Sequence, residues 1–247
     1  MLVVEHLSKA FGAVQVTKNV SFSLERGERR VILGPNGAGK TTLFNQLVGE
    51  IRPDSGLIIL GNEDISDWSV DRRAQAGLAR SYQKNTLFDS LSVRENLSLS
   101  AMTSLGKSSW LLTDAFHDRE VIDLTRDVAS QVALTDYLEH RVDSISYGMR
   151  RQLEVGIALA SQPRVLLMDE PTSGVGPEMI GGFHQLLSSL PQSLTLLIVE
   201  HDMDLAFDIA DQILVLNYGE VVFEGSPEEA RGSALLKEIY LGSWDDA

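Results

Sequence analysis

Residues 34–42 form a glycine-rich segment whose residue types suit the binding of phosphate. They fit the pattern G-x-x-x-x-G-K-[ST] and read Gly34, Pro35, Asn36, Gly37, Ala38, Gly39, Lys40, Thr41 and Thr42. Glycines let consecutive backbone N–H groups turn toward one anion, and a helix that follows adds a partial positive charge at its N-terminus. We therefore expect Lys40 to reach the β- and γ-phosphates of a nucleotide, and the Thr41 hydroxyl to bind Mg²⁺.

The residues on either side of this phosphate loop favour a strand before it and a helix after it. The run 30–33 is short and mostly apolar, whereas 43–48 continues with apolar residues at helical spacing. The alternative is a chance glycine turn, but such a turn would not be expected to follow a strand and precede a helix. Nucleotide binding is the preferred interpretation.

Two carboxylates follow a second apolar run, 165–168. A strand delivers its last side chains to the carboxyl edge of the sheet, where ligands of open α/β folds bind. Asp169 is then placed to hold Mg²⁺, and Glu170 is the candidate general base that polarises an attacking water. The alternative is a pair of solvated acids at the end of a strand, which becomes less attractive beside a matched phosphate loop.

Three further positions could serve the same chemistry. His201 follows the apolar run 194–199, so its imidazole could hydrogen-bond a γ-phosphate and orient water. Gln83 could ligate Mg²⁺ or water through its amide, although most glutamines are surface residues. Ser146 is a good N-cap for a helix, and the residues alone indicate an ordinary capped helix to which no function is assigned. The other histidines are interpreted as structural.

The elements that position these residues indicate an α/β fold. Apolar strands at 2–4, 20–24 and 57–60 predict an antiparallel N-terminal β subdomain, and the buried runs around the phosphate loop predict a mostly parallel sheet with flanking helices. A final hairpin is expected at 213–223. We expect a single domain over 1–247, with a core at about 1–90 and 163–247 and a helical subdomain at about 91–162.

Composition limits the classes of function. The chain has 247 residues, no cysteine and a net charge of −14, so it carries neither disulfides nor thiolate metal sites. Its acidity argues against direct binding of nucleic acid or anionic lipid. No apolar run approaches the roughly 20 residues of a membrane span. We therefore expect a cytoplasmic protein whose association with a membrane runs through protein partners.

Taken in chain order, these motifs resemble those of the ATP-binding-cassette (ABC) ATPases, from Leu2 to about Glu228. The resemblance implies an ATPase that uses ATP and Mg²⁺, which are held between two ATPase chains. It also implies that the signature residues Ser146, Tyr147 and Gly148 of one chain complete the γ-phosphate site of the other. Phe11 matches the aromatic residue that stacks on adenine, with a core phenylalanine as the alternative.

Within that family, segments 77–83, 91–97 and 199–203 are most similar to the ATPase subunits of branched-chain amino-acid importers and of their urea- or amide-type relatives. This similarity implies two membrane permease subunits as partners, an extracytoplasmic solute-binding protein acting indirectly, and a position on the inner face of the plasma membrane. The second ATPase chain is a copy or a paralogue.

Other classes remain as alternatives: a lipopolysaccharide-type exporter ATPase, a soluble ABC ATPase that acts on ribosomes or DNA, and a small-molecule kinase. The sequence also departs from the family pattern at Met149, where glutamine is usual, and at Gly176, where aspartate is usual. The second departure bears on communication between the two nucleotide sites, and not on ATP binding.

Overall fold

The computed structural model describes residues 1–81, 87–107, 116–173 and 176–240. The chain divides into two compact units, which are described separately. The first comprises Met1–Arg73 and Thr195–Ala247, and the second comprises Ala74–Leu194.

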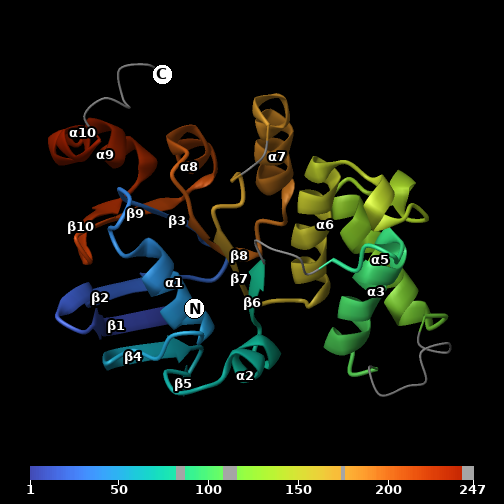
Figure 1. The fold of residues 1–247 in the computed structure, drawn as a ribbon, viewed down its shortest axis with the longest axis horizontal. Helices are drawn as coiled ribbons and strands as arrows, with labels where there is room; N and C mark the ends of the chain where they lie inside the picture. Colours follow the sequence, from blue (N-terminus) through green and yellow to red (C-terminus); the bar gives the residue numbers. More distant parts are fainter. Residues whose placement is uncertain (82–86, 108–115, 174–175, 241–247) are drawn as a thin grey trace. The chain divides into compact units, whose positions relative to one another are not determined.

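The first unit begins with an antiparallel sheet (Figure 1). Its strands, in the order β2-β1-β4-β5, are β1 (Leu2–Phe11), β2 (Val14–Leu24), β4 (Ser55–Leu60) and β5 (Glu63–Asp64). Leu2, Val4 and Leu7 of β1 are buried, as are Val20 and Leu24 of β2. The predicted N-terminal β subdomain is confirmed, and its strands extend beyond the short apolar runs because polar residues on the outer face continue the pairing.

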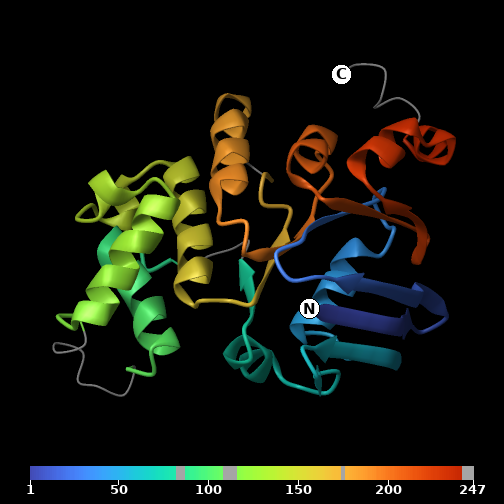
Figure 2. The same ribbon diagram turned by 180° about the vertical axis from the view of Figure 1, so that it is seen from behind.

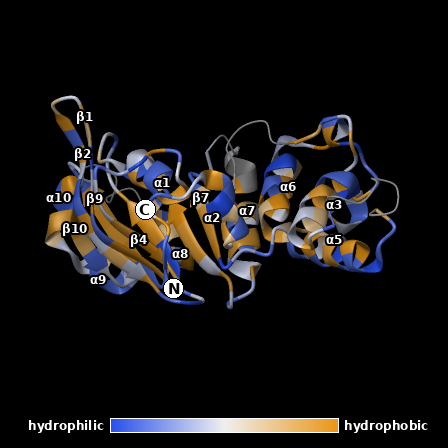
Figure 3. Ribbon diagram, turned by 90° about the horizontal axis from the view of Figure 1, so that it is seen from below, coloured by the Kyte–Doolittle hydropathy of each residue, from blue (hydrophilic) through white to orange (hydrophobic). Residues whose placement is uncertain are grey.

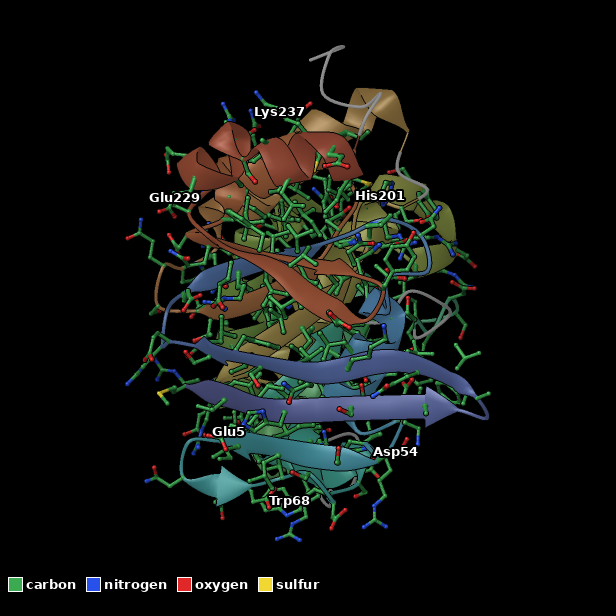
Figure 4. All side chains as sticks on the ribbon, turned by 90° about the vertical axis from the view of Figure 1, so that its left-hand side faces the viewer. Glu5, Asp54, Trp68, His201, Glu229 and Lys237 are labelled. Atoms are coloured by element: carbon green, nitrogen blue, oxygen red, sulfur yellow. The ribbon has the colours of Figure 1, made fainter. Side chains whose placement is uncertain are left out.

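The second sheet of this unit carries the phosphate loop. Its strands run in the order β10-β9-β3-β8, and they are β3 (Arg29–Leu33), β8 (Thr195–Val199), β9 (Gln212–Asn217) and β10 (Glu220–Gly225). Strand β3 pairs in parallel with β8 and β9, whereas β9 and β10 form the predicted antiparallel hairpin. β10 contacts β2, which lies beside it in Figure 4. All five residues of β8 are buried, as expected for an inner parallel strand.

Helices surround these strands. They are α1 (Lys40–Val48), α2 (Val70–Gln75), α8 (Met203–Ile209), α9 (Pro227–Gly232) and α10 (Ala234–Ile239). Helix α1 contacts both β2 and β8, so it packs between the two sheets, as seen from both sides in Figures 1 and 2. Glu229 of α9 and Lys237 of α10 are labelled in Figure 4, and both are exposed.

The second unit combines two parallel strands with a group of helices. Strand β6 (Leu78–Ser81) pairs with β7 (Val165–Asp169). The helices are α3 (Val93–Ser104), α5 (Arg119–Gln131), η1 (Thr135–Tyr137), η2 (Val142–Ser144), α6 (Tyr147–Ala160) and α7 (Pro177–Ser189).

Helices α3, α5 and α6 pack on one another. A Cβ at Gly156 of α6 would stand 3.0 Å from Leu97 Cδ2 and 3.2 Å from Val132 Cγ2, so glycine permits the close approach. Helix α5 has a hydrophobic and a hydrophilic side (Figure 3). The predicted helical character of this region is confirmed.

The predicted subdomain limits near 91 and 162 stay a prediction. They follow the change from strands to helices in the sequence, whereas the two compact units follow the contacts between residues. Among the described residues, no helix is both long and apolar enough to cross a membrane.

Candidate functional site

The phosphate loop joins β3 to α1, as the sequence predicts. Strand β3 ends at Leu33 and α1 begins at Lys40, with Gly39 as its N-cap residue. Gly37 has φ 81° and Gly39 has φ 101°. Both lie in the left-handed region that glycine enters without a steric penalty, so the loop can turn its backbone N–H groups toward one point.

Neighbouring backbone holds the loop closely. A Cβ at Gly34 would stand 2.3 Å from the carbonyl oxygen of Leu216, and one at Gly39 would stand 2.5 Å from that of Val16. The Gly219 N–H, in the turn between β9 and β10, donates to the Ala38 carbonyl at 3.0 Å. Strand β2 and the hairpin β9–β10 therefore fix the loop from outside.

Lys40 and the exposed loop residues form the part that can receive an anion. The Lys40 side chain is buried, and its Nζ donates to the Gly34 carbonyl at 2.5 Å and to the Pro35 carbonyl at 3.3 Å. Asn36, Gly37 and Thr41 are exposed. The ammonium charge of Lys40 therefore lies within the loop that the sequence predicts to bind phosphate.

Phe11 lies at the end of β1 and is half exposed, so it is not a core residue. The Lys9 Nζ stands 5.7 Å from the centroid of its ring. An exposed ring is free to stack on a base, and that role stays a prediction.

His201 follows β8 at the same sheet edge as the loop. Ile32 pairs with Val199, and the Glu200 N–H donates to the Ile32 carbonyl at 3.1 Å. The His201 side chain is 60% exposed, and its Nδ1 lies 3.6 Å from Glu200 Oε2. Glu200 itself is fully buried and accepts from the backbone N–H groups of His201 at 3.0 Å and Asp202 at 3.4 Å.

Glu200 is a residue whose role sequence reasoning missed. Its carboxylate fixes the backbone that carries the imidazole of His201. A charged residue directly after an apolar strand was the available signal, but the burial of its side chain depends on the surrounding fold.

In the second unit, Asp169 ends β7 and is buried, with 5% of its surface exposed. Its Oδ2 lies 3.9 Å from Arg80 Nη2, on the neighbouring strand β6. Ser81 pairs with Met168, so β6 and β7 end at one edge. Gln83, which the sequence predicts could ligate Mg²⁺ or water, lies outside the described residues.

Glu170 has a strained backbone, with φ 44°. Its carbonyl accepts from the Ser173 N–H at 2.9 Å, which closes a turn after the strand. A non-glycine residue in the left-handed region costs roughly 1–2 kcal/mol, and such strain concentrates at functional sites. The side chain is partly exposed and can meet a water molecule.

Ser146 is the N-cap residue of α6, and its hydroxyl accepts from the Met149 N–H at 3.3 Å. Ser146 and Tyr147 are exposed, whereas Gly148 is buried. The predicted N-cap is therefore observed, at a start of α6 where Ser146 and Tyr147 are exposed. These residues belong to the second unit with Asp169 and Glu170, whereas the phosphate loop and His201 belong to the first.

The oxygen donors predicted for Mg²⁺ fit that ion chemically. Mg²⁺ is bound through one or two protein oxygens, with phosphate and water completing its shell. The Thr41 hydroxyl is exposed in the first turn of α1, and Asp169 offers a buried carboxylate at a strand end.

Comparison with known proteins shows the family of the chain. Residues 17–173 match the model of the family described as "ABC transporter". The chain is 32% identical to the high-affinity branched-chain amino acid transport ATP-binding protein BraF of Pseudomonas aeruginosa, covering 98% of each chain. It is 34% identical to the corresponding LivG protein of Salmonella typhimurium, again over 98% of each. It is also 32% identical to the lipopolysaccharide export system ATP-binding protein LptB of Haemophilus influenzae, over 98% of this chain and 97% of the relative.

Solved structures give the same result. The ADP conformation of MJ1267, an ATP-binding cassette of an ABC transporter, superposes with a TM-score of 0.83 at 27% identity, covering 98% of this chain and 99% of that one. A nucleotide-free ATP-binding cassette superposes with a TM-score of 0.82 at 26% identity, with the same coverage. The phosphate loop, the strand-end carboxylates and the capped signature helix thus occur in a chain that belongs to the ABC transporter family of nucleotide-binding ATPases.

Proposed function

We propose that this chain is the ATP-hydrolysing subunit of an importer for branched-chain or related amino acids. Two observations together carry the proposal. The phosphate loop between β3 and α1 is intact, and the chain is 32–34% identical, over 98% of its length, to branched-chain amino acid transport ATP-binding proteins.

In this proposal the loop N–H groups and Lys40 bind the β- and γ-phosphates of ATP. The burial of Lys40 supports this role, because a charge with little water around it interacts more strongly with an anion. Thr41 and Asp169 hold Mg²⁺, which neutralises charge on the phosphates when bound. The chemistry is mainly positional and electrostatic.

Glu170 and His201 orient the attacking water for in-line displacement. The Glu170 carboxylate accepts a proton from that water, and the His201 imidazole donates a hydrogen bond to the γ-phosphate. The buried Glu200 supports the role of His201, because it fixes the backbone from which the imidazole projects.

Two ATPase chains close on two nucleotides, and Ser146, Tyr147 and Gly148 of each chain complete the site of the other. Two membrane permease subunits couple this closure to transport, and a solute-binding protein acts from outside the cell. The chain then sits peripherally on the inner face of the membrane. The exposed start of α6 supports this arrangement, since it leaves the signature residues accessible to a partner.

The test is a co-purification of the full chain with a C-terminal tag, produced at its native level, from detergent-solubilised membranes. Recovery of permease subunits and a second ATPase, with uptake of branched-chain amino acids lost on deletion, is the expected result. Recovery of lipopolysaccharide export subunits would instead favour the exporter, which the 32% identity to LptB makes the second candidate. Recovery from the cytosol without membrane proteins would contradict transport.

A further inference from the structure

Arg151, one turn into α6, joins parts of the second unit that are distant in sequence. Its Nε donates to the Tyr147 hydroxyl at 3.0 Å, its Nη1 to Glu154 Oε2 at 2.8 Å, and its Nη2 to the Ser173 carbonyl at 3.2 Å. The guanidinium also stands 5.2 Å from the centroid of the Tyr147 ring. One side chain therefore holds the first turn of α6 and the turn that follows Glu170.

The ion pair within this network is largely buried. The side chains of Arg151 and Glu154 are each 12% exposed. Burial raises the pKa of Glu154, although the nearby Arg151 acts to lower it. For Arg151, burial lowers the pKa, but the interactions with Glu154 and Tyr147 outweigh this effect, so the pKa of Arg151 is raised. Buried ion pairs contribute little net stability, so stability alone does not account for this one.

The pair also borders the carboxylate predicted to hold the metal. A pocket beside the pair is lined by Arg151, Glu154, Asp169 and Pro171, among others. The network of Arg151 therefore lies beside the end of β7 as well as beside the turn that follows Glu170.

We propose that Arg151 is a positioning residue that makes the signature turn (146–148) and the turn after Glu170 move as one body. The inference rests on the proposed function, in which 146–148 completes the site of a second ATPase chain. Tyr147, which Arg151 orients, is 49% exposed and can face that partner, whereas the other side of the network reaches Ser173. Arg151 then fixes the position of the signature residues relative to the end of β7, where Asp169 and Glu170 lie.

The first measurement is hydrogen exchange on the nucleotide-free full chain, which needs no partner. In Arg151→Met, the amides of 147–150 and of Ser173 should both exchange at least about 10-fold faster, since both lose the same anchor. Arg150→Met is the matched control, because Arg150 is the adjacent residue of α6 and pairs instead with Asp89 at 3.0 Å. It should leave Ser173 unchanged. Faster exchange in only one segment, or in neither, would overturn the coupling.

The second measurement is ATP-driven dimerisation in the Glu170→Gln background, followed by sedimentation with MgATP. Arg151→Met should weaken the dimer at least about 10-fold while leaving the ATP affinity of the monomer within about twofold, and Arg151→Lys should restore only part of the loss, because one ammonium cannot replace the planar fork. A purely structural role would lower both quantities together. The double variant Arg151→Met/Glu154→Gln leaves no unpaired buried charge, so it tests the idea if the single variant does not fold.

The outcomes separate the two proposals. Coupled exchange with unchanged dimerisation would overturn the presentation role of Arg151 and leave the proposed function standing. A Glu170→Gln parent that stays monomeric with MgATP would contradict the sandwich in the proposed function, and would remove the partner-facing role of Arg151 with it, whatever the exchange data show.

Discussion

In the proposed function, Lys40 is the residue on which nucleotide binding depends most directly. Its ammonium group is buried and shared between the carbonyls of Gly34 and Pro35. Lys40→Ala should weaken MgATP binding roughly 100-fold or more, a loss of about 2.7 kcal/mol, because the β- and γ-phosphates lose a charged hydrogen-bond donor. Isothermal titration calorimetry measures the affinity. Lys18→Ala, which removes a half-exposed lysine paired with Glu220, is the control and should bind normally; unchanged affinity in Lys40→Ala would remove the phosphate-loop assignment.

Tyr240 gives a second prediction at this scale, through pH. Burial raises the pKa of its phenol to about 12, against the opposing effect of the Gly34 backbone. Between pH 10 and 12 the folded protein keeps a proton that the unfolded chain releases, so stability falls as pH rises, by up to about 2–3 kcal/mol. Absorbance titration at about 295 nm should show a step near pH 12 that Tyr240→Phe removes. Tyr218→Phe, at a side chain 79% exposed, should retain the step; a step that survives in Tyr240→Phe would contradict the assignment.

At the scale of elements, Arg73 of α2 fixes the helix that follows the phosphate loop. It is 1% exposed, and its Nη1 donates to the carbonyls of Gln46 at 2.7 Å and Leu47 at 2.6 Å, in the last turn of α1. Burial lowers its pKa to about 10, so it stays charged at neutral pH. A cation at this end complements the helix dipole, while Gly49 leaves room for it, since a Cβ there would stand 2.9 Å from Arg73 Nε.

Arg73→Met should therefore lower the free energy of unfolding by about 3 kcal/mol or more, because buried carbonyls lose their donor. Arg72→Met is the adjacent control. Arg72 is exposed and stacks 3.7 Å from the centroid of the Trp68 ring, so its loss should cost about 1 kcal/mol or less. Urea unfolding measures both. Equal effects of the two variants would mean that Arg73 does not anchor α1.

The elements also show how far the sequence alone could predict the site. The loop at 34–42 and the two carboxylates at the end of β7 and directly after it were predictable, because their chemistry depends on neighbours in the sequence. The anchors Arg73 and Arg151 were not, because each acts through backbone groups that only folding brings near it. Glu200 was not either, because the complete burial of its side chain depends on the surrounding fold. Spacing offered one partial signal: Tyr147, Arg151 and Glu154 lie on one face of α6 at helical intervals. Short β6 was also missed, since four residues carry too little pattern.

For the whole molecule, the decisive property is the net charge of −14. In the proposed function, two copies that close on two nucleotides would bring together like charges, so local phosphate contacts would have to drive closure against a general repulsion. Salt weakens that repulsion, because the Debye length falls from about 30 Å at 0.01 M to about 8 Å at 0.15 M. Contacts with buried phosphate groups are screened much less. Moderate salt should therefore strengthen the dimer and not weaken it.

Glu170→Gln tests this at the scale of the assembly. The amide cannot accept the proton from water, so hydrolysis should stop and ATP should hold two chains together. Sedimentation with MgATP should show a dimer that tightens as NaCl rises from about 0.01 to 0.15 M, the range over which screening changes most.

Ser146→Arg in the same background is the matched control, since it places a long side chain at the exposed N-cap of α6 and should block the dimer with the ATP affinity of the monomer intact. A dimer that forms equally well with Ser146→Arg would mean that the signature turn does not face the partner. Loss of ATP binding in that variant would mean that it acts within its own chain.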